Sequence, residues 1–174
     1  MFDKEYSFRG THAEKVIKLT AEFDRNKNKL FSTNYDVYIM AAIVGYMYTR
    51  KADVDKGTET TKIFPDKLIK EQSDLIFTYR LIMLLDSTNE PNFDERVNKA
   101  FRYYGSDKAA QDEQLYEQYV RGGVDVLYEK LVASANTEED YLKNLYDFMD
   151  EFDSRYNQSI STESIMDLCR LARS

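Results

Sequence analysis

Two adjacent glycines, Gly122 and Gly123, lie in the middle of a segment whose apolar residues have helical spacing. The segment, residues 115–131, reads LYEQYVRGGVDVLYEKL, and its apolar positions keep to one face on both sides of the pair. Glycine in a helix interior costs about 1 kcal/mol relative to alanine. The pair therefore indicates a helix that needs space for a close neighbour, and we expect the helix to continue across both glycines. A kink at the pair is the alternative.

Residues 37–48 provide the natural neighbour for this helix. Their sequence, VYIMAAIVGYMY, is apolar almost all round, which is typical of a helix that is buried on most of its surface. Ala41 and Gly45 are small and four residues apart, so they lie above one another on one helix face. We expect one glycine of the pair to face Ala41 or Gly45 with no room for a methyl group. The other should lie about 100° around the helix, where alanine is tolerated.

The rest of the chain predicts an all-α, single-domain helical bundle that extends over residues 1–174. Only two prolines and six glycines interrupt the 174 residues, which favours long helices joined by short polar loops. The hydrophobic fraction of 43% is too high for a disordered chain. Between residues 51 and 64 we expect a short hairpin or an irregular connection. About seven helices are expected, over residues 11–24, 34–48, 65–86, 93–104, 112–132, 137–157 and 162–171.

Capping residues mark the starts of several of these helices. Thr11 and Glu14 have the spacing of a capping box, in which the two side chains satisfy the first backbone amides of a helix. Thr33 or Asn34 can cap the next helix, and Thr137 can cap the last long one.

The chain carries a formal net charge of −7. An acidic chain is repelled on average by phosphate backbones and by anionic membranes, which disfavours direct nucleic-acid binding. A local basic patch on a DNA-contacting regulator is the alternative. Its candidate residues are Arg9, Arg25, Lys27, Lys29, Arg50 and Lys51.

The sequence predicts a cytoplasmic protein without a membrane span. The longest apolar-rich window, residues 37–48, is shorter than the roughly 18 residues that a transmembrane helix needs. The N-terminal sequence MFDKEYSFRG lacks the apolar run of a signal peptide. Cys169 is the only cysteine, which excludes an intrachain disulfide and a cysteine-based metal site.

Four residues are candidate contacts to a partner or an anion: Arg9, His12, Arg50 and Arg80. His12, the only histidine, follows Arg9 at the start of a predicted helix, where Arg9 and the helix N-terminus could bind an anion. A structural or solvated histidine is the alternative. Arg50 belongs to the local basic patch named above. Arg80 is the only charge in residues 75–85, so we expect a partner for it in the core, or a stem on apolar surface with the head in water.

The chain contains no recognisable catalytic or metal-binding motif. A Gly-x-Ser-x-Gly stretch is absent, and a serine hydrolase would have to use the single histidine. The acidic residues Asp147, Asp150 and Glu151 lie on one predicted helix, which supplies too few converging ligands for a cation. We therefore expect no catalytic residue, no metal and no cofactor. An enzyme whose site combines distant carboxylates and arginines is the alternative.

Three stretches together resemble a family of small helical bacterial proteins that are associated with DNA phosphorothioation (Dnd) modification and restriction loci. They are RGTHAEK (residues 9–15), DVYIMAAIVGYMYTRKADVD (36–55) and YVRGGVDVLYEKL (119–131), and the resemblance extends over about residues 7–153. It implies an accessory role in a DNA-defence system, together with larger proteins encoded in the same locus. It assigns no catalytic residue.

The combined expectation is a non-enzymatic accessory or adaptor protein that acts through protein–protein contacts. The fourteen tyrosines suit such a surface, because tyrosine combines apolar area with a polar tip. The sequence leaves the oligomeric state open, including a homo-oligomer.

Overall fold

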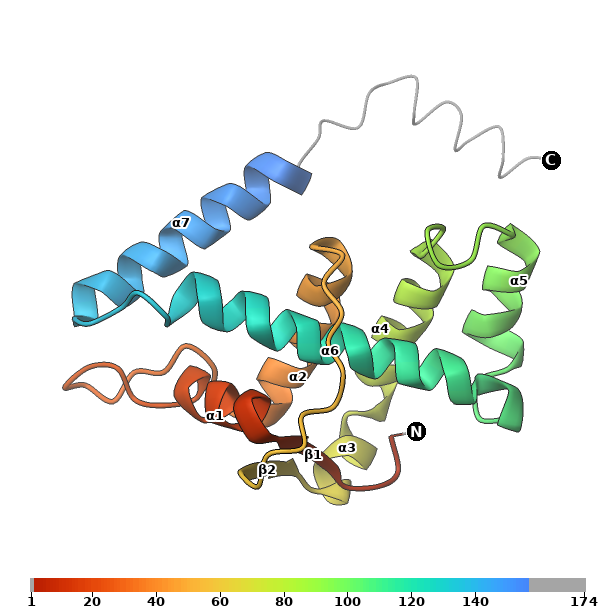
Figure 1. The fold of residues 1–174 in the computed structure, drawn as a ribbon, viewed down its shortest axis with the longest axis horizontal. Coiled ribbons are helices and arrows are strands. Elements are labelled where there is room, and N and C mark those ends of the chain that lie inside the picture. The colour runs from red at the N-terminus through yellow and green to blue at the C-terminus, as the bar shows by residue number, and fades with distance from the viewer. Residues whose placement is uncertain (1, 157–174) are drawn as a thin grey trace.

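The computed structural model describes residues 2–156 as a helical fold with one two-stranded sheet (Figure 1). The predicted helical class is confirmed. In chain order the elements are β1 (Tyr6–Arg9), α1 (Gly10–Leu19), α2 (Asn34–Met47), β2 (Thr60–Ile63), α3 (Pro65–Lys70), α4 (Gln72–Leu85), α5 (Phe93–Val97), the π-helix η1 (Asn98–Arg102), the 3-10 turn η2 (Asp107–Ala109), α6 (Ala110–Leu131) and α7 (Glu138–Tyr156).

The helices are divided differently from the prediction in two places. The predicted helix over residues 65–86 is two helices, because α3 ends and α4 begins at Glu71. The first helix ends at Leu19 rather than near residue 24. The predicted helix over residues 162–171 lies outside the described residues.

The starts of α2 and α7 follow the predicted capping pattern. The Thr33 hydroxyl accepts from the backbone amide of Asp36, and the Asp36 carboxylate accepts from the backbone amide of Thr33. At α7, the Asp140 amide donates to the Thr137 hydroxyl over 3.3 Å. A capping box at Thr11 is wrong, because the Thr11 amide and hydroxyl donate to the distant side chain of Asp55 over 2.9 Å and 2.7 Å.

The two strands come from distant parts of the chain, so the short hairpin between residues 51 and 64 is wrong, and the irregular connection, the other expectation, describes the segment that precedes β2. Strand β2 pairs antiparallel with β1, with Tyr6 opposite Ile63 and Arg9 opposite Thr60. Residues 49–59, which we call the crossing segment, instead pass over α6 (Figure 1). Two hydrogen bonds to the Ala52 backbone hold them there: the Ala52 amide donates to the Gln118 carbonyl over 3.1 Å, and the side-chain Nε of Arg121 donates to the Ala52 carbonyl over 2.9 Å.

Helix α6 runs through the middle of the fold and carries the centre of the core (Figure 1). Its Tyr116 side chain is fully buried. The ring centroids of Phe2, Tyr38 and Tyr79 lie 5.8, 6.1 and 5.7 Å from that of Tyr116. Aromatic rings at these separations attract one another in edge-on and tilted arrangements. This cluster joins α2, α4, α6 and the N-terminal segment in one core.

Candidate functional site

The glycine pair lies where α6 crosses α2. A Cβ on Gly123 would overlap the carbonyl oxygen of Ala41 and lie 2.8 Å from the Gly45 amide nitrogen. A Cβ on Gly45 would overlap the carbonyl oxygen of Tyr119 and lie 2.9 Å from the Gly123 amide nitrogen. The two backbones are therefore in direct contact at Gly45 and Gly123, which is the close packing expected from the sequence.

The second glycine faces a different part of the chain. A Cβ on Gly122 would overlap the carbonyl group of Arg50 and lie 2.8 Å from the Lys51 amide nitrogen. The expectation that this position tolerates alanine is therefore wrong, because the crossing segment covers it. Helix α6 is continuous through the pair, and Gly10 and Gly105 are the glycines with positive φ in the described part of the chain. A kink at the pair is thus wrong as well.

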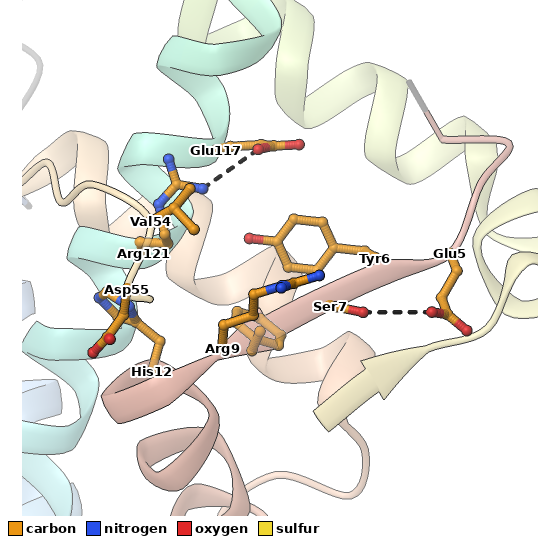
Figure 2. Close-up of a pocket in the computed structure, with 10 residues that line it drawn as sticks. Glu5, Tyr6, Ser7, Arg9, His12, Val54, Asp55, Glu117 and Arg121 are labelled. Carbon is orange, nitrogen blue, oxygen red and sulfur yellow. Dashed lines mark hydrogen bonds and ion pairs between the residues drawn. The ribbon is translucent and has the colours of Figure 1, made fainter. Parts of the chain in front are cut away.

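The crossing segment closes one side of a polar pocket of about 410 Å³ (Figure 2). Strand β1 contributes Tyr6 and Arg9, and the crossing segment contributes Asp55. Helix α6 contributes Glu117 and Arg121. The structure thus brings the predicted residues Arg9 and His12 to one pocket. The full lining is Glu5, Tyr6, Ser7, Phe8, Arg9, His12, Val54, Asp55, Glu117 and Arg121.

Asp55 occupies the place at the start of α1 where the sequence suggested an external anion. Its carboxylate accepts from the Thr11 hydroxyl, from the Thr11 amide and, over 2.8 Å, from the Gly57 amide. These hydrogen bonds to the ionised form lower the pKa of Asp55 to about 2. The helix N-terminus is therefore already neutralised by a side chain of the same protein.

His12 is buried and lies beside an ion pair between α1 and α6. Its Nε2 atom is 3.5 Å from the Asp125 carboxylate, which also accepts from Lys15 over 2.7 Å. Burial opposes the ionisation of Asp125, but the bonds from His12 and Lys15 outweigh it and lower the pKa of Asp125. The surroundings of His12 fit the structural alternative.

The remaining charges of the pocket are also largely paired. Burial raises the pKa of Glu117, whose carboxylate lies 3.4 Å from Nη1 of Arg121. Burial likewise raises the pKa of Tyr6, and the charge of Glu117 adds to the effect. Arg9 is exposed, and its side chain forms no hydrogen bond or ion pair with the described residues. The pocket therefore presents a single uncommitted cation.

The other residues of the predicted local basic patch contact different side chains or lie in a different part of the chain. Nη2 of Arg50 lies 3.2 Å from Glu129, and both side chains are about half exposed. Lys51 Nζ lies 5.5 Å from the centroid of the Tyr119 ring. Arg25, Lys27 and Lys29 lie in the turn between α1 and α2.

A second cavity, apolar and of about 500 Å³, opens between α4 and η1, and we call it the α4 groove. Its α4 residues recur at helical spacing on one face. Phe77 is 67% exposed, and Phe101 on the η1 side is 53% exposed. The lining is Ser73, Ile76, Phe77, Arg80, Leu81, Leu84 and Phe101.

Arg80 is the only charged residue that lines the α4 groove. Its guanidinium carbon lies 5.4 Å from the centroid of the Phe101 ring. Its Nε atom is buried and has no hydrogen-bond partner among residues 2–156, where no carboxylate forms an ion pair with it. Within residues 2–156 the expected partner of Arg80 in the core is therefore absent, and the alternative, a stem that lies along apolar surface, describes the arrangement.

Hydrogen bonds from the Arg96 side chain fix the arrangement of the elements that form the groove. Arg96 Nε donates to the Leu84 carbonyl over 2.9 Å, and its Nη1 donates to the Glu90 carbonyl over 2.8 Å. These bonds hold α5 against the end of α4. The five-residue π-helix η1 that follows then places Phe101 opposite Arg80.

Sequence reasoning missed most of the groove. Residues 75–85 are apolar on every side, so the pattern did not distinguish exposed Phe77 and Leu81 from buried Leu75 and Tyr79. The isolated charge of Arg80 was the available signal, because a lone arginine favours the exposed side of such a helix.

Comparisons with known proteins add no relative: no family model, no curated protein and no solved structure matches the chain. Within residues 2–156, no helix combines the length and the apolar content that a membrane span requires. In the same part of the chain, no group of three or more His, Cys, Asp or Glu side chains is placed to hold a metal ion.

Proposed function

We propose that this protein is a non-enzymatic adaptor of a bacterial DNA modification or defence system, and that it binds protein partners through the α4 groove. The observation that carries the adaptor role is the exposure of Phe77, Leu81 and Phe101 around one cavity. Contiguous exposed apolar surface of this kind marks interaction sites in folded proteins. The association with a DNA phosphorothioation locus rests on the sequence resemblance.

The polar pocket supports an adaptor over an enzyme. An enzyme needs groups that are free to exchange protons or to contact a substrate. Asp55 is held by Thr11 and Gly57, and Glu117 lies against Arg121. These groups stabilise the crossing segment and the start of α1, so their charges are bonded within the protein and stabilise its folded state.

The net charge of −7 supports protein partners over DNA. We expect the isolated protein to bind generic duplex DNA with a Kd weaker than about 1 μM at physiological salt. A fluorescence anisotropy titration at several salt concentrations measures this. Tight binding that weakens steeply with salt would instead favour the DNA-contacting regulator.

Co-expression with the proteins encoded beside it tests the adaptor function. We expect one of these proteins to co-elute with the chain in size-exclusion chromatography, and the variant Phe77→Asp to abolish the complex. Met149→Asp is the matched control, because Met149 is 62% exposed on α7, outside the groove. Survival of the complex in Phe77→Asp, or no complex with any of the neighbouring gene products, would contradict the proposal.

A further inference from the structure

We infer that the α4 groove selects a partner helix that carries a carboxylate beside its apolar anchors, and that this carboxylate pairs with Arg80. The inference rests on the proposed function, since the groove must first bind a protein. It adds the chemistry of the partner.

The walls of the groove favour a helix as the occupant. Its α4 side is built from residues 73–84, which extend over roughly 16 Å at 1.5 Å per residue, or about three helical turns. The lining consists of side chains, and α4 uses its own backbone groups within the helix. An extended peptide would leave its amides unpaired there, whereas a helix satisfies its backbone internally and presents anchors at spacings of three and four.

The charge of Arg80 favours a carboxylate on that helix. A docked partner would remove water from the guanidinium group, and a buried charge without a partner is strongly unfavourable. The contact of the guanidinium group with the Phe101 ring offsets only part of this desolvation cost. A carboxylate can accept from two guanidinium nitrogens at once, which adds geometric specificity.

No acidic residue in the described part of the chain forms an ion pair with Arg80. The acids Glu90 and Asp112 lie 3.5 Å and 3.3 Å from Lys99. Glu95 accepts from the Asn98 side chain over 3.0 Å. Among the described residues, the Arg80 guanidinium group therefore remains free to pair with a carboxylate of the partner.

The same charge disfavours a second copy of this chain as the occupant. In a symmetric dimer the same surface of both copies meets. Two Arg80 guanidinium groups would then lie in one apolar interface, where like charges repel.

Selection from a displayed library of amphipathic helical peptides, with the full chain as bait, tests the inference. We expect the enriched peptides to carry Asp or Glu within one turn of their apolar anchors. Arg80→Gln should weaken the binding of the selected peptides by about thirtyfold or more, which is the usual effect of truncating one partner of a buried charge pair. Arg80→Glu should enrich Lys or Arg at the same position instead. The control is Arg102→Glu, because Arg102 is exposed and bonded to Asn98 outside the groove lining.

The outcomes separate this inference from the proposed function. Peptides that lose binding in Phe77→Asp but show no acidic preference and no response to Arg80→Gln would overturn the inference and leave the groove as a docking site. A full chain that enriches no peptide dependent on Phe77 would overturn both. Sedimentation velocity that shows a dimer abolished by Phe77→Asp would identify a second copy as the occupant, which also overturns the inference.

Discussion

At the scale of single residues, a contact that the sequence predicted with an external anion is made with another side chain of the same protein. Arg9 and His12 suggested an anion at the start of the first helix, and Asp55 of the same chain supplies the negative charge. This contact joins residues that are 44 positions apart. No local pattern signals it, whereas the Thr33 cap involves residues three positions apart and could be predicted.

The acid stability of the protein depends on Asp55. Because the pKa of Asp55 in the folded state is about 2, below its ordinary value of 3.8, its contribution to stability is present above pH 3.8 and is lost as the pH falls towards 2. We expect Asp55→Asn to lower the free energy of unfolding at neutral pH. The variant should also lose less unfolding free energy than the wild type as the pH falls from 3.8 to about 2. Urea unfolding at a series of pH values measures both effects.

Asp147→Asn is the control for this experiment. Asp147 is exposed on α7, and its side chain forms no hydrogen bond or ion pair with the described residues. An Asp55→Asn variant with the stability and acid sensitivity of the wild type would contradict the structural role of Asp55.

A buried tyrosine of α6 that bonds to the end of α4 gives a second prediction for a single residue. The Tyr119 hydroxyl donates to the Asp86 carboxylate over 2.7 Å, and both residues are buried. Tyr119→Phe leaves the carboxylate without this donor and should cost about 1–3 kcal/mol of unfolding free energy. Chemical denaturation measures the change. Tyr146→Phe, at a position that is 69% exposed, should have almost no effect; equal effects of the two substitutions would refute the argument.

At the scale of elements, helix positions could be predicted where the signal is local. Helices α2, α6 and α7 lie close to their expected ranges, because apolar spacing and caps are properties of neighbouring residues. The pairing of β1 with β2 could not be predicted, since each strand has four residues and its partner is more than fifty positions away. The division at Glu71 has no proline or glycine to mark it.

The cap of α2 provides the element-scale prediction. Thr33 and Asp36 satisfy two backbone amides at its start. We expect Thr33→Ala to destabilise the protein by about 1 kcal/mol, the usual cost of losing an N-cap. Thr58→Ala, at an exposed site in the crossing segment, is a control with the same chemical change. Thermal unfolding of the two variants should differ by a few degrees, and identical melting temperatures would show that the cap contributes nothing.

At the scale of the whole molecule, α6 is enclosed on two sides by parts of the chain that follow one another. Helix α2 contacts it at Gly123, and the crossing segment that follows α2 contacts it at Gly122. Sequence patterning predicted the first contact, because small residues recur on both helices. It missed the second, because an irregular segment has no periodicity from which its path can be inferred. The polar pocket was missed for the same reason, since Asp55 lies on that segment.

Both glycines allow another backbone to approach α6, and unfolding measurements on Gly122→Ala and Gly123→Ala test this role. Each methyl group would overlap a backbone carbonyl of α2 or of the crossing segment. Each substitution should therefore lower the free energy of unfolding by about 1–3 kcal/mol or more, despite the roughly 1 kcal/mol that alanine gains in helix propensity. Gln114→Ala, at an exposed position of α6, should leave stability almost unchanged. We expect destabilisation at both glycines, and an increase in stability from either substitution would show that the glycine is not needed for close backbone packing.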